Sequence, residues 1–122
     1  MKILALLPLI LSANLAYAEC LVSNIKIKSI KTEFISKCKT RDCFHLNGVA
    51  VLDNQCKESI GVQIKSIAYD IKGSPVSVEQ FWPASVENIN TGEYIFSMNW
   101  KHQYDPAIHR IEIKPIKVKK WN

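Results

Sequence analysis

The sequence lacks the common short motifs of catalysis and of cofactor binding. It has only four glycines among 122 residues, and neither a glycine-rich phosphate loop nor a Gly-x-Ser-x-Gly nucleophile turn is present. Cys-x-x-Cys pairs are also missing, which argues against a zinc site. We therefore expect a protein that is not an enzyme and that carries no metal and no cofactor.

Long apolar segments are also missing, except at the N-terminus. There, Lys2 precedes an apolar run at 3–11, and the small residues Ala16 and Ala18 flank Tyr17. This is the layout of a cleavable signal peptide, and the run is shorter than the roughly 20 residues that span a bilayer. We expect residues 1–18 to be a signal peptide and residues 19–122 to be one domain, periplasmic or secreted, without membrane insertion.

No segment shows apolar residues at helical spacing, and short runs alternate between apolar and polar residues instead. The clearest run places Tyr94, Phe96, Met98 and Trp100 on one face of a strand, and this period of two is typical of half-buried strands. Turn residues separate seven such segments, near 22–31, 44–53, 61–71, 75–82, 84–90, 93–101 and 108–120. This pattern predicts an all-β fold, an immunoglobulin-like or fibronectin-type antiparallel β-sandwich of about seven strands, with a small closed barrel as the alternative.

Two changes in the alternation predict irregular positions. Val62 and Ile64 lie in one phase, whereas Ile67 and Tyr69 lie in the other, which predicts a bulge or a change of face near 65–66. A second change of phase follows Pro115.

The four cysteines, Cys20, Cys38, Cys43 and Cys56, all lie in the predicted mature chain. An even number in an exported protein favours two disulfides. The strand at 44–53 would span about 30 Å, so Cys43 and Cys56 should not pair. A first strand antiparallel to it would bring Cys20 beside Cys56. We therefore expect Cys20–Cys56 and Cys38–Cys43.

Part of the chain resembles the FxLYD-type domains of bacterial envelope proteins. The matching segments cover about half of the mature chain: Asn47-Gly48-Val49-Ala50-Val51, Ile67-Ala68-Tyr69-Asp70 with Gly73, and Thr91-Gly92-Glu93-Tyr94-Ile95-Phe96. The resemblance implies an immunoglobulin-like sandwich in the cell envelope. It implies no activity and no functional residues, because such sandwiches have many unrelated roles.

Adjacent aromatic residues provide one candidate interface. Phe81 and Trp82 point to opposite faces if they lie on a strand, so one of them should be exposed and available to a protein partner. A covering loop is the alternative. Trp100 shares its face with Phe96 and Met98, and we expect it in the core.

The C-terminal segment provides a second candidate. Lys114, Lys117, Lys119 and Lys120 lie close to Trp121, in a chain with a formal net charge of +5. These lysines are expected either to contact an acidic partner or to protect an exposed sheet edge from aggregation. Nucleic acid is not an expected partner, because the aromatic residues are not interleaved with the basic ones.

The histidines allow one further hypothesis. His102 and His109 flank the turn that contains Asp105, and the three side chains would form the best metal or acid–base candidate in the sequence. The leading hypothesis remains an exported binding protein that acts by protein–protein contact, for example an inhibitor or immunity protein. An envelope-assembly or surface-adhesion accessory is the first alternative, and a metal-dependent enzyme is the second.

Overall fold

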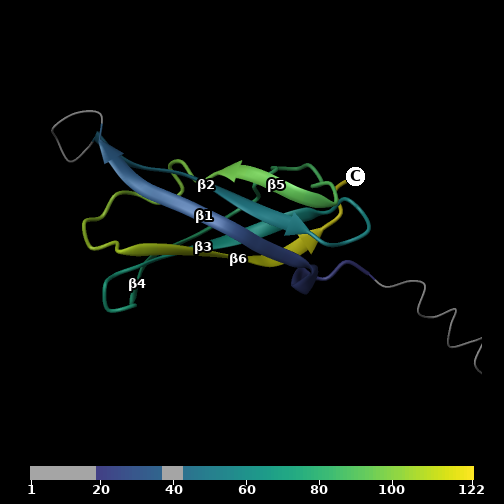
Figure 1. Cartoon of the computed structure of the whole chain (residues 1–122), viewed down its shortest axis with the longest axis horizontal. Helices are drawn as coiled ribbons and strands as arrows, with labels where there is room; N and C mark the ends of the chain where they lie inside the picture. The colour runs from purple at the N-terminus through teal and green to yellow at the C-terminus, as the bar shows by residue number, and fades with distance from the viewer. Residues whose placement is uncertain (1–18, 37–42) are drawn as a thin grey trace, which may run out of the picture.

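A computed structural model of the chain describes residues 19–36 and 43–122 and contains six β-strands in this part (Figure 1). The strands are β1 (Ile25–Ser36), β2 (Phe44–Asn54), β3 (Gly61–Tyr69), β4 (Pro75–Phe81), β5 (Gly92–Ser97) and β6 (Arg110–Lys119). A 3-10 turn, η3 (Val22–Asn24), precedes β1. Within the described ranges no helix is long and apolar enough to cross a membrane.

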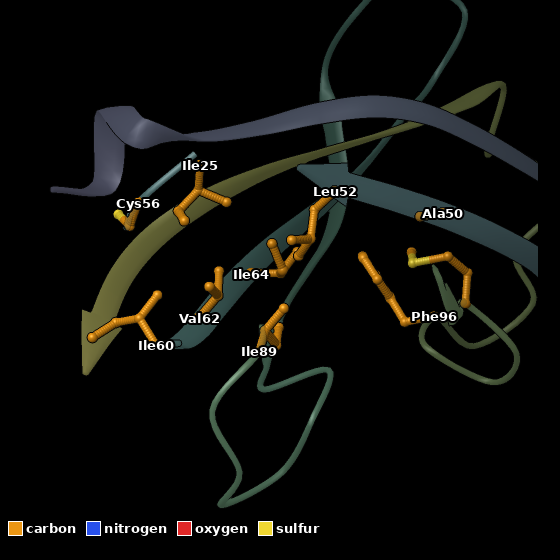
Figure 2. Packing of buried hydrophobic residues seen from close by; sticks show 10 residues of the cluster. Ile25, Ala50, Leu52, Cys56, Ile60, Val62, Ile64, Ile89 and Phe96 are labelled. Atoms are coloured by element: carbon orange, nitrogen blue, oxygen red, sulfur yellow. The ribbon is translucent and has the colours of Figure 1, made fainter. Parts of the chain in front are cut away.

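The strands form two antiparallel sheets, one with the order β1-β2-β5 and the other with the order β4-β3-β6. The prediction of an all-β fold is therefore confirmed. Side chains from both sheets meet in one core (Figure 2), in which Leu52, Ile64, Ile89 and Met98 are almost completely buried. Apolar burial of this kind is the main stabilising contribution in a domain of this size.

One predicted strand, at 84–90, is not a strand. The segment turns twice, with hydrogen bonds from Ser85 N–H to the Trp82 carbonyl (2.9 Å) and from Glu87 N–H to the Ala84 carbonyl (3.1 Å). Only Ile89 bridges to a neighbour, Ile60. Of the apolar residues that suggested a strand, Ile89 lies in the core, and the rest of the segment forms a surface loop.

The two predicted changes of phase had opposite outcomes. β3 keeps a single alternation, in which Val62, Ile64, Ser66 and Ala68 are all buried, so the predicted change near 65–66 is wrong. The change after Pro115 is confirmed, because Gln63 pairs with Lys117 and Ile64 pairs with Pro115. This leaves Ile116 as the extra residue of a bulge.

The disulfide between Cys20 and Cys56 is confirmed, with a Cα–Cα distance of 5.3 Å. It follows from the antiparallel pairing of β1 with β2, which places Ile25 opposite Asn54. The predicted Cys38–Cys43 pair involves Cys38, which lies outside the described residues, so this pairing stays a prediction.

Candidate functional site

A hollow of about 670 Å³ lies at the end of the domain where β2 begins. We call this the hollow end, and we call the opposite end, with the Cys20–Cys56 disulfide, the stapled end. The hollow is lined by three aromatic residues, two histidines and three polar or charged residues: Phe44, Trp100, Tyr104, His45, His102, Glu79, Lys101 and Gln103. Five of these residues come from the segment that follows β5.

Trp100 is the most exposed aromatic side chain of the hollow, with 71% of its surface accessible. The prediction that it lies in the core is wrong, because β5 ends at Ser97 and Trp100 adopts a left-handed backbone conformation with φ +66°. One face of its indole stacks on His45, with ring centroids 4.2 Å apart and an angle of 13° between the planes. His45 therefore covers one face of the indole, and much of the remaining indole surface is accessible.

The turn that carries Trp100 is fixed to β2 by hydrogen bonds. The Asn99 side-chain oxygen accepts from Gly48 N–H at 2.8 Å, and Trp100 N–H donates to the Leu46 carbonyl at 3.0 Å. Met98 lies directly before this turn and is fully buried. A buried methionine and two long-range hydrogen bonds therefore determine the position of the exposed tryptophan.

Tyr104 forms a second aromatic contact at the hollow end. Its ring stacks on Phe44 at 4.6 Å and meets the edge of Phe34 at 5.2 Å. These contacts connect the segment after β5 to β1 and β2. Phe44 and Tyr104 form an aromatic wall of the hollow.

The remaining wall is polar and carries both signs of charge. Glu79, Lys101 and Gln103 line it, and the Lys101 ammonium also lies 4.4 Å above the ring centroid of Phe81. Hydrogen-bond donors and acceptors therefore lie beside an exposed indole, which is the usual composition of a site that recognises a ligand or partner by one apolar anchor and a few polar contacts.

His102 lines the hollow and is buried. One ring nitrogen lies 2.7 Å from the Ser66 hydroxyl and the other lies 2.6 Å from the Ser77 hydroxyl. A neutral ring satisfies both, because one hydroxyl accepts from the ring N–H while the other donates to the bare nitrogen. Burial lowers the pKa of His102 below its ordinary value of 6.5, and the nearby charge of Glu79 partly opposes this shift.

The Ser66–His102 contact has the geometry of a nucleophile beside its base, but Ser66 is completely buried on the core face of β3. A substrate has no access to its hydroxyl in this structure. The contact instead ties the segment after β5 to the second sheet.

The predicted grouping of His102, Asp105 and His109 does not form a metal site. Within 19–36 and 43–122, no three His, Cys, Asp or Glu side chains are placed to hold a metal ion together. Asp105 accepts from Ala107 N–H in its own turn, and His109 is exposed, with its backbone N–H bonded to the Tyr69 carbonyl.

The structure places most of the predicted interface residues at the stapled end. Trp82 meets Trp121 edge to face, with ring centroids 5.2 Å apart, and both residues are half-buried. Phe81 is also half-buried and packs against the core residue Phe96 at 6.1 Å. Each of the two neighbouring aromatics, Phe81 and Trp82, is therefore covered in part by another aromatic ring.

The basic C-terminal residues take part in the same packing. The Lys119 ammonium lies 4.1 Å above the Trp121 ring centroid, and Lys120 forms an ion pair of 2.8 Å with Glu58. The backbone of Trp121 is held at both its N–H and its carbonyl by the Asn88 side chain. Lys117 is exposed on β6.

Comparison with known proteins leaves the fold and the site to be interpreted from this chain alone. No protein-family model matches the sequence, and no curated protein matches it. A solved structure, the Northeast Structural Genomics Consortium target SoR45, is similar at 16% identity and a TM-score of 0.42, over 84% of this chain and 89% of that one. A likeness at this level supports no statement about function.

Proposed function

We propose that this chain is an exported, non-enzymatic binding protein that recognises a protein partner at its hollow end, with Trp100 as the anchor. The observation that carries the proposal is an exposed indole held in a left-handed backbone conformation beside polar groups of both charges. Tryptophan is among the residues that contribute most to binding energy in protein interfaces.

The backbone conformation strengthens the argument. A left-handed conformation costs a residue other than glycine roughly 1–2 kcal/mol, and an exposed indole gains little from burial in the isolated protein. Unfavourable conformations of this kind concentrate at functional sites. Burial of the exposed indole surface of Trp100 against a partner would offset this conformational cost.

The finer description of the fold and location belongs to the same proposal. We take the domain to be immunoglobulin-like and related to the FxLYD-type domains. The proposal is supported by the sheet order, since β1, β2 and β5 pair as strands A, B and E do, and β3 pairs with β6 as C does with F. The Cys20–Cys56 disulfide and the signal-like N-terminus support a periplasmic or secreted location.

One form of this function is an inhibitor or immunity protein whose Trp100 enters a pocket of an exported toxin or hydrolase. An envelope-assembly or surface-adhesion accessory would use the same anchor on a different partner. The set Phe81, Trp82, Lys117, Lys119, Lys120 and Trp121 remains a second candidate interface, which the same experiment tests.

The test compares variants of the mature protein as bait for partners in the native envelope fraction. Trp100→Ala is expected to weaken capture of the specific partner about 30-fold, which corresponds to about 2 kcal/mol, the usual size of an interface hot spot. Val86→Ala is the matched control, because Val86 is 67% exposed in the loop before β5. This variant should capture the partner as wild type does.

Circular dichroism establishes that each variant remains folded. Retention of every partner by Trp100→Ala would contradict the proposal. Loss of the partner on Trp82→Ala alone would move the interface to the stapled end.

A further inference from the structure

The free edges of the two sheets differ in how well they are protected against pairing with another chain. β1 and β6 carry lysines on their exposed faces, and each pairs through a register shift that marks a bulge. β4 begins at Pro75, and its pairing with β3 also has a register shift. β6 also contains Pro115, which has no N–H to offer. Lysine, proline and bulges are the features by which natural sheets prevent edge-to-edge association.

β5 has none of these features. Its sequence, Gly-Glu-Tyr-Ile-Phe-Ser, contains no lysine and no proline, and its pairing with β2 continues without a register shift. It lies at the edge of its sheet. Among the described residues, only β2 forms hydrogen bonds to the backbone of β5.

The hydrogen-bond pattern shows which backbone groups of β5 face away from β2. Met98 N–H donates to the Gly48 carbonyl at 2.9 Å, so this pair is of the hydrogen-bonded kind. Because bonded and non-bonded pairs alternate along antiparallel strands, the N–H and carbonyl groups of Glu93, Ile95 and Ser97 point to the free edge. The side chain of Ile95 is also 67% exposed.

We propose that the edge of β5 binds the same edge of a second copy of this chain, in an antiparallel pair with its two-fold axis at Ile95. In this arrangement Ile95 meets Ile95 of the second copy, and Glu93 meets Ser97 of the second copy. Every outward N–H and carbonyl of the three residues then has a partner. The β1-β2-β5 sheet of one copy then continues into the β1-β2-β5 sheet of the second copy. Such an interface is isologous, as in a symmetric dimer.

The side chains of β5 suit this self-pairing. Val51 lies opposite Ile95 on the outer face of the sheet, so the dimer forms a continuous apolar row across the junction. In the dimer, Glu93 faces Ser97 of the second copy and not another carboxylate. Its carboxylate also lies 4.0 Å from the Lys28 ammonium of its own copy. Two copies of β6 would instead bring Lys114, Lys117 and Lys119 close to one another, where like charges destabilise the pair.

The experiment measures the mass of the oxidised mature protein by sedimentation equilibrium over a range of concentrations. Wild type is expected to reach twice the monomer mass. Ile95→Lys and Ile95→Glu are each expected to weaken self-association at least tenfold, because equal charges then meet at the two-fold axis. A one-to-one mixture of these two variants should recover the dimer, because a lysine then faces a glutamate.

Ile71→Lys is the matched control, since Ile71 is 78% exposed in the turn between β3 and β4, and it should dimerise as wild type does. A wild type that stays monomeric overturns the inference, as does a dimer that both Ile95 variants leave intact. A monomer that captures another protein through Ile95 would assign the edge to a different occupant and also overturn it. Trp100→Ala should keep the dimer, so failure here is distinct from failure of the proposed function.

Discussion

The two ends of the domain differ in what their aromatic residues do. At the stapled end, Trp121 packs on Trp82 and its backbone is held by Asn88. At the hollow end, Trp100 stacks on His45 with one face and leaves 71% of its surface accessible. The same residue type therefore stabilises the fold at one end and remains available for contact at the other.

This difference follows from the neighbours that each tryptophan meets. Gly61 has no side chain, and a Cβ atom there would overlap the Trp121 indole and approach the Lys119 carbonyl to 2.7 Å. The stapled end thus has a place into which an indole fits. The turn at Asn99 instead directs Trp100 outward. A tryptophan contributes to stability only where the fold provides a surface to cover it.

The largest expected effect comes from removal of the covalent link at the stapled end. The double variant Cys20→Ala with Cys56→Ala opens a loop with a sequence separation of 36 residues, and the unfolded chain gains the corresponding freedom. The free energy of unfolding should fall by about 4 kcal/mol, measured by urea denaturation of the mature protein. A loss below about 1 kcal/mol would show that the other contacts of this end suffice without the disulfide.

A matched pair of substitutions tests the comparison directly. Trp121→Ala should lower the free energy of unfolding by about 3 kcal/mol, because it removes packing on Trp82 and Gly61. Trp100→Ala should cost about 1 kcal/mol or less, because the variant loses mainly one stacked contact with His45. Equal losses in urea denaturation would mean that the two ends do not differ in this way.

The sequence was sufficient for features that depend on neighbours along the chain. Alternation of apolar and polar residues predicted β2, β4 and β6 closely, and the change of phase after Pro115 corresponds to a real bulge. The Cys20–Cys56 disulfide was predictable because an antiparallel pair of consecutive strands brings their far ends together.

The hollow end was not predictable, because distant residues decide its geometry. Asn99 turns the chain by bonding to Gly48, 51 positions away, and nothing in the local sequence marks the end of the strand before Trp100. The sequence predicted a bulge or a change of face near Ser66, because the apolar alternation is interrupted there. Ser66 lies on the core face because His102, 36 positions away, satisfies its hydroxyl.

The last expected effect is an acid sensitivity that His102 contributes at the hollow end. Burial lowers the pKa of His102 from 6.5 in the folded protein, so the unfolded chain binds the proton more readily. The contribution of neutral His102 to the free energy of unfolding is therefore fully present above about pH 6.5. It declines as the pH falls toward the folded pKa, by at most about 1.4 kcal/mol per pH unit for one proton. Urea denaturation between about pH 5 and pH 8 should show this decline in wild type. The decline should diminish in His102→Gln and persist in His109→Gln, because His109 is exposed. If His102→Gln keeps the full decline, acid acts elsewhere in the molecule, and the hollow end does not owe its sensitivity to the bonds of His102 with Ser66 and Ser77.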